Sequence, residues 1–219
     1  MSGLSRKLLV EFIGTFTLIF LGAGAGTVAG MNVGGGLITV ALAHGLTVMF
    51  CAYAFGHISG SHINPAVSIG LLAAGKMSGR DTIAYVITQI VAGIAGAALL
   101  AVVFSGQDVS LGATNMSEGT STVAAMILEA IGAFLLVSVI LQTAVAGRAG
   151  NLAPLAIGMT LAANIMFFGP LTGASLNPAR TIGPALMTGQ MDSIVIYSVA
   201  TILGGVLAGL LFRSVLAED

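Results

Sequence analysis

The tripeptide Asn-Pro-Ala occurs twice in this chain, at residues 64–66 and 177–179. An asparagine amide donates two hydrogen bonds from its nitrogen and accepts others at its oxygen. Asparagine is also a favoured N-cap and proline suits the first helical position, so each tripeptide predicts the abrupt start of a helix. The alternative is two interfacial turns that share a tripeptide by coincidence. The chemistry offered is hydrogen bonding to small neutral molecules, with no bond made or broken.

Four ionisable residues in apolar surroundings form the second set of candidates. Arg180 directly follows the second tripeptide, and Glu11, Glu129 and His44 lie in or beside long apolar runs. Because a buried charge is costly in a membrane, we expect Glu11 and Glu129 to be paired and not merely to reach toward the interface. For His44, the residues alone favour a core histidine bonded to a neighbouring carbonyl.

The remaining reactive or polar side chains indicate structure more than catalysis. Cys51 is the single cysteine, which excludes an intrachain disulfide and favours an inert packed thiol. His57 and His62 are expected to order a loop, since no carboxylate or cysteine near them suggests a metal site. Gln89 is expected to bond between helices. We therefore expect no enzyme activity, no cofactor and no metal.

Composition identifies the class of protein that must position these residues. The chain has 219 residues, of which 57% are hydrophobic and 7% charged, with a mean hydropathy of +1.06. Soluble domains carry about 25% charged residues. A net charge of −1 also lacks the basic face of a nucleic-acid binder. The N-terminal apolar run continues like a first span and not like a cleaved signal. These features predict a polytopic helical membrane protein.

The uncharged stretches predict six spans, since a helix needs about 20 residues to cross the hydrocarbon core. We place them near residues 8–29, 36–56, 81–104, 121–145, 152–169 and 193–213. Two apolar pieces remain, 64–75 and 177–187, and each begins at an Asn-Pro-Ala tripeptide. Twelve helical residues rise only about 18 Å, so each piece is predicted to be a half-helix.

The two halves of the chain repeat one another. Glu11 and Glu129 lie 118 residues apart in similar hexapeptides, and the two tripeptides lie 113 residues apart. We therefore divide this single channel domain into repeat one (1–104), a linker (105–120) and repeat two (121–219). Three spans per repeat force the second copy into the opposite topology, an inverted 3+3 repeat.

Basic residues predict the orientation. They lie before span one, between spans two and three, between spans four and five and at the end of span six: Arg6, Lys7, Lys76, Arg80, Arg148 and Arg213. All of these fall on one side, which the positive-inside rule makes cytoplasmic together with both termini. Arg180 is the exception, which makes it a functional candidate.

Inversion brings the N-termini of the two half-helices together near the membrane midplane. Their dipoles would place positive potential there, together with the amides of Asn64 and Asn177. Irregular backbone at that depth must line a watery cavity, so we expect pore-facing carbonyls in both loops. These are the carbonyls of Gly60, Ser61, His62 and Ile63, and of Gly173, Ala174, Ser175 and Leu176.

The sequences His57-Ile-Ser-Gly-Ser-His62-Ile-Asn-Pro-Ala-Val67 and Gly173-Ala-Ser-Leu-Asn-Pro-Ala-Arg180 resemble the two signature loops of the aquaporin (major intrinsic protein) family. The resemblance covers nearly the whole chain. It implies a homotetramer with one pore per subunit, with Asn64, Pro65, Ala66, Asn177, Pro178 and Ala179 at the pore centre. It also implies that Glu11 and Glu129 accept loop N–H groups. The outer constriction implied by the resemblance consists of His44, Ile165, Ala174 and Arg180.

The function expected from this resemblance is a passive channel for water, with ammonia and urea as further neutral solutes. A glycerol facilitator is the alternative within the family, but Thr181 follows the arginine here where those proteins usually carry aspartate. An ion-coupled secondary transporter is the alternative from another class, and it would need more ionisable groups at midplane. Short loops and tails favour a prokaryotic plasma membrane. Expected partners are water, small neutral solutes and the lipid bilayer, without nucleic acid.

Overall fold

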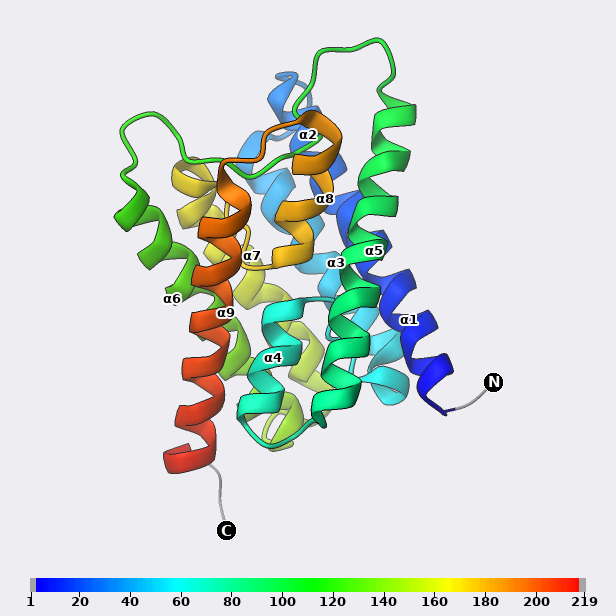
Figure 1. Cartoon of the computed structure of the whole chain (residues 1–219), viewed down its shortest axis with the longest axis vertical. Coiled ribbons are helices and arrows are strands. Elements are labelled where there is room, and N and C mark those ends of the chain that lie inside the picture. The colour runs from blue at the N-terminus through cyan, green and yellow to red at the C-terminus, as the bar shows by residue number, and fades with distance from the viewer. Residues whose placement is uncertain (1–2, 217–219) are drawn as a thin grey trace.

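The computed structural model describes residues 3–216, which fold into helices joined by loops (Figure 1). The α-helices are α1 (Gly3–Leu18), α2 (Gly24–Gly30), α3 (Gly36–Ser59), α4 (Pro65–Ala73), α5 (Gly79–Val103), α6 (Thr122–Ile140), α7 (Ala153–Thr172), α8 (Pro178–Thr188) and α9 (Ser193–Leu211). Short helical segments of other pitch complete them: η1 (Ile19–Ala23), η2 (Leu141–Val145), η3 (Gly150–Leu152) and η4 (Phe212–Leu216).

Six continuous helical stretches of the described chain are long and apolar enough to cross a membrane, as the sequence predicts. They are Gly3–Gly30, Gly36–Ser59, Gly79–Val103, Thr122–Val145, Gly150–Thr172 and Ser193–Leu216. The first joins α1, η1 and α2, and the fourth joins α6 and η2, so both contain a π-helical segment. Such wide turns are rare and occur frequently at functional sites.

The two half-helices α4 and α8 lie between the spans and point in opposite directions, with their N-termini facing each other at mid-height (Figure 1). Each packs against the third span of the opposite repeat, α4 on α9 and α8 on α5. Glycines permit this approach. A Cβ on Gly93 would lie 2.6 Å from the carbonyl oxygen of Ala179, and one on Gly205 would lie 2.5 Å from that of Ala66. The repeats are therefore interlocked, not simply joined.

The segment between α5 and α6, predicted as a linker over residues 105–120, also contacts the half-helix α8. Leu111 and Thr114 are buried, and the hydroxyl of Thr114 lies 3.0 Å from that of Thr181. The division into repeats remains a prediction, and its ends at residues 1–2 and 217–219 lie outside the described residues.

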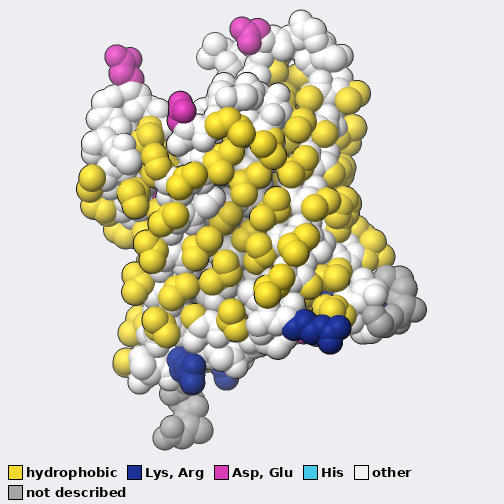
Figure 2. Space-filling model, viewed as in Figure 1, with side chains coloured by type: hydrophobic (Ala, Val, Ile, Leu, Met, Phe, Trp, Pro, Cys, Tyr) yellow, Lys and Arg dark blue, Asp and Glu magenta, His cyan; other side chains and the backbone are white. Residues whose placement is uncertain are grey.

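The surface carries a broad apolar band, with basic side chains gathered at one end and acidic ones at the other (Figure 2). Large apolar side chains in the band are well exposed, among them Val195 at 71% and Ile38 at 62%. Water would make so much exposed apolar surface unfavourable, whereas lipid does not. The chain is a multi-pass membrane protein.

Candidate functional site

The half-helices begin abruptly because Asn64 and Asn177 cap them. Both residues have extended backbone, with φ of −158° and −155°, and each is followed by proline in the first helical turn. Oδ1 of Asn64 accepts the N–H of Ala66 at 2.8 Å, and Oδ1 of Asn177 accepts that of Ala179 at 3.0 Å. The caps fix both amide planes and direct each Nδ2 away from its own helix.

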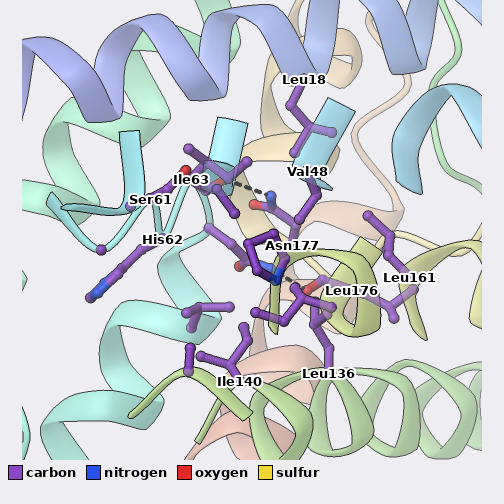
Figure 3. Close-up of a pocket in the computed structure, with 18 of the residues that line it drawn as sticks. Leu18, Val48, Ser61, His62, Ile63, Leu136, Ile140, Leu161, Leu176 and Asn177 are labelled. Atoms are coloured by element: carbon purple, nitrogen blue, oxygen red, sulfur yellow. Dashed lines mark hydrogen bonds between the residues drawn. The ribbon is translucent and has the colours of Figure 1, made fainter. Parts of the chain in front are cut away.

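Each asparagine amide then bonds to the loop of the opposite repeat. Nδ2 of Asn64 donates to the carbonyl oxygen of Leu176 at 2.9 Å, and Nδ2 of Asn177 donates to that of Ile63 at 3.0 Å. Figure 3 shows these bonds beside the cavity. An amide nitrogen carries two hydrogens, so one on each asparagine remains for a molecule in the cavity.

The loop that precedes each half-helix is held by one buried glutamate. Glu11 accepts the N–H groups of His62 and Ile63 at 2.9 and 2.7 Å. Glu129 accepts those of Ser175 and Leu176 at the same two distances. Both carboxylates are fully buried, so these bonds replace the water that the charges would otherwise bind.

Hydroxyl groups complete both carboxylate sites. Ser59 donates to Glu11 and Thr172 donates to Glu129, each at 2.7 Å. Gln89, expected to bond between helices, donates to Glu11 at 2.8 Å. Sequence reasoning missed Ser59 and Thr172, although they lie 113 residues apart, the same interval as the two tripeptides. That shared interval was a signal that could have identified them.

The backbone of the two loops adopts the left-handed conformation at equivalent positions. Ser61 and Ile63 have φ of 48° and 45°, and Ala174 and Leu176 have φ of 46° and 53°. This region is unfavourable for side chains with a Cβ, above all for a β-branched residue such as Ile63. Strain of this kind persists only where the surroundings enforce it, here through the glutamate and asparagine bonds.

A cavity of about 270 Å³ passes through this arrangement (Figure 3). Asn64 and Asn177 line it, together with apolar side chains that include Val67, Leu136 and Leu161. One wall therefore offers hydrogen-bond donors and the other offers none. Six of the eight residues whose carbonyls we predict to face the pore also line it: Gly60, Ser61, His62, Ile63, Ser175 and Leu176.

His44 and Arg180 close one part of the cavity lining with a direct bond. Nε of Arg180 donates to Nε2 of His44 at 3.1 Å, while Nδ1 of His44 lies 2.9 Å from the carbonyl oxygen of Val40. A neutral imidazole protonated on Nδ1 satisfies both contacts. Both side chains are buried, and Nη1 of Arg180 has no hydrogen-bond partner within the described chain.

The other two residues of the predicted constriction are placed differently. Ile165 and Ala174 are buried, each 2% exposed, but neither is among the residues lining the 270 Å³ cavity. Gly173 is likewise absent from that lining. For Ile165 and Ala174, membership of the constriction therefore stays a prediction.

The histidines of the first loop have different surroundings. Nδ1 of His62 lies 3.0 Å from Oγ of Ser68, which also bonds to Gln89. His57 instead lies exposed in the last turn of α3. Of the two residues expected to order the loop, only His62 bonds within it.

Comparison with known proteins shows the same architecture elsewhere. Residues 1–212 match the family described as Major intrinsic protein. "Aquaporin Z" of Rhodopseudomonas palustris is 39% identical over 95% of this chain and 92% of its own length. "Aquaporin AqpM" of Methanothermobacter thermautotrophicus is 38% identical over the full length of both. The X-ray structure of the aquaglyceroporin from Plasmodium falciparum superposes with a TM-score of 0.83 at 26% identity, covering 98% of this chain and 97% of that one.

Proposed function

This chain belongs to the major intrinsic protein family, and on that premise we propose that it is a passive channel for water. The relatives named aquaporin support water as the solute. The observation that carries the proposal is the pair of crossed asparagine bonds, which present one free amide hydrogen each to the cavity. No reaction is needed for transport, so the protein acts as a channel and not as an enzyme.

Water would cross the centre of the pore by exchanging hydrogen-bond partners. Its oxygen accepts from Asn64 and Asn177, while the apolar side chains of Leu136 and Leu161 across the lining offer no partner. A molecule there must direct its oxygen toward the asparagines and its hydrogens toward its neighbours in the file. Removing the hydration shell of an ion at this point has no such compensation.

Ion exclusion follows from the charges around the cavity. The N-termini of α4 and α8 each contribute roughly half a positive charge, and Arg180 adds a full one. Among the described residues, no aspartate, glutamate or lysine lines the cavity. Cations and protons would therefore meet a positive potential without a compensating carboxylate.

Urea and ammonia are further solutes in this proposal, because the constriction would consist of His44, Ile165, Ala174 and Arg180. Two donors on one side and two apolar side chains on the other suit a solute with one polar face. Glycerol is a weaker candidate. Thr181, at the position where glycerol facilitators usually carry aspartate, is fully buried and bonds to the hydroxyls of Ser175 and Thr114.

An ion-coupled transporter is not favoured by the surroundings of the two buried carboxylates. All four oxygens of Glu11 and Glu129 accept hydrogen bonds from the described chain. A coupling carboxylate needs room for a proton or a metal ion during transport. Both glutamates instead serve to hold the loops.

The assembly and orientation belong to the same proposal. We infer a homotetramer, with each subunit containing its own pore, from membership of the family. The basic end of the molecule in Figure 2 is assigned to the cytoplasm of a prokaryotic cell, which places the start of α1 and the end of η4 on that side.

Stopped-flow light scattering of proteoliposomes tests the proposal. Vesicles with the protein should shrink faster in a sucrose gradient than protein-free vesicles, with or without a proton gradient. Flux that depends on the proton gradient would identify a transporter instead. Glycerol flux as fast as water flux would identify a glycerol facilitator.

A further inference from the structure

The His44 imidazole lies against a glycine of the first span. A Cβ built on Gly22 would lie 2.6, 2.7 and 2.8 Å from Cδ2, Nε2 and Cγ of the His44 ring. These three ring atoms are the nearest heavy atoms to that position outside the local backbone. Real Cβ atoms essentially never approach other atoms so closely, so the ring occupies the space that any other residue at position 22 would fill.

The backbone at Gly22 is itself unusual. Gly22 belongs to the π-helical segment η1, Ile19–Ala23, which interrupts the first span between α1 and α2. A π-helical segment widens the helix locally and changes which side chains face a neighbour. Here it presents the one residue without a side chain to the ring that contacts Arg180.

The second repeat lacks this arrangement at the corresponding positions. The repeat intervals of 118 and 113 residues relate Gly22 to Ile140 and His44 to Ile157. Both isoleucines line the cavity, so two large apolar side chains stand where the first repeat has a glycine and an imidazole. The space at Gly22 is therefore matched to His44 and is not a general feature of the fold.

We propose that Gly22 is a positioning residue of the constriction, which seats the His44 ring against the first span so that Nε2 reaches Arg180. This inference rests on the proposed channel function and specifies how its selectivity is set. A side chain at position 22 displaces the ring away from the first span. The ring then loses its bond to Nε of Arg180, and both groups enter the path of the solute.

A double-mutant cycle tests the proposal: Gly22→Ala, His44→Ala and the combined variant, each in proteoliposomes. Gly22→Ala should lower water and urea permeability per protein severalfold, because the displaced ring narrows the constriction. In the His44→Ala background the same substitution should change neither, because the ring is gone. Gly30→Ala is the matched control, since it adds a methyl group to the same span with nothing within 4 Å.

An equal loss in both backgrounds would assign Gly22 to helix packing and overturn the proposal, as would unchanged transport by Gly22→Ala. Thermal unfolding midpoints of the four proteins in detergent give a second readout. Gly22→Ala should be destabilised in the presence of His44 and not in its absence. If Gly22→Ala fails to fold, folding of the double variant supports the proposal and its failure overturns it. Wild-type vesicles no more permeable than protein-free ones would refute the channel function alone, because the unfolding cycle still tests the contact.

Discussion

The amide nitrogen of Asn64 lies 2.9 Å from the carbonyl oxygen of Leu176, a residue of the opposite repeat. The reciprocal bond joins Asn177 to Ile63 at 3.0 Å. Each asparagine therefore caps its own half-helix through Oδ1 and ties down the other repeat through Nδ2. The pore centre is thus a structural joint as well as the proposed site of solute contact.

Replacement of Asn64 by alanine should lower stability as well as water flux. The variant loses an N-cap, worth about 1 kcal/mol, and leaves the Leu176 carbonyl without its partner at about 1–3 kcal/mol. We expect a lower unfolding midpoint in detergent and a lower water permeability. Asn151→Ala, at an exposed residue, is the control and should behave as wild type. An unchanged midpoint for Asn64→Ala would contradict the structural half of this role.

Removal of the Glu129 carboxylate should destabilise the second loop. Glu129→Ala leaves the N–H groups of Ser175 and Leu176 and the hydroxyl of Thr172 unpaired, at roughly 1–3 kcal/mol each. Thermal unfolding followed by size-exclusion chromatography should show a lower midpoint and loss of the native oligomer. Glu118→Ala, the same change at an exposed residue, is the control. Full stability and flux for Glu129→Ala would remove the loop-holding role.

The spans and half-helices could be predicted because their signals are local. Charge-free length gives the spans, and Asn64 followed by Pro65 gives a helix start, so α4 begins at the residue the motif indicates. The hydroxyl partners Ser59 and Thr172 carry no such signal, because serine and threonine are common and their role depends on the partner carboxylate. Sequence reasoning found them only as ordinary helix residues.

The contact between Gly22 and His44 could not be predicted for a different reason. It depends on where a π-helical turn falls in the first span and on how that span crosses the second. Small residues recur throughout this chain, 31 of them glycines, so composition does not single out one position. Only the three-dimensional packing shows that this glycine faces an imidazole.

Arg180 should be needed for ion exclusion more than for water flux. In Arg180→Val the guanidinium charge is lost while the helix dipoles and both asparagines remain. We therefore expect water permeability near that of wild type, with a raised proton or cation leak measured by a pH-sensitive dye inside the vesicles. Arg213→Val, at an exposed arginine, is the control. A variant as ion-tight as wild type would exclude Arg180 from the electrostatic barrier.

The last prediction concerns solute selectivity, which depends on the two sides of the proposed constriction. His44 and Arg180 supply donors on one side, whereas Ile165 leaves the fifth-span side apolar. Resemblance to some plant vacuolar aquaporins, which share this combination, points to ammonia and urea passage. We therefore expect proteoliposomes to pass ammonia faster than protein-free vesicles, urea more slowly and glycerol least.

A double substitution tests this assignment, because strict water channels resemble one another in having phenylalanine on span two and histidine on span five. The combined variant His44→Phe with Ile165→His places a bulky ring on one side and a polar ring on the other, which narrows the file and favours water. Water permeability should persist while the ammonia-driven pH change falls toward that of protein-free vesicles. His57→Phe makes the same exchange at an exposed histidine and should leave both fluxes unchanged. The assignment fails if wild-type vesicles conduct water but show no ammonia flux above background, since the apolar side at Ile165 would then have no effect on which solutes pass.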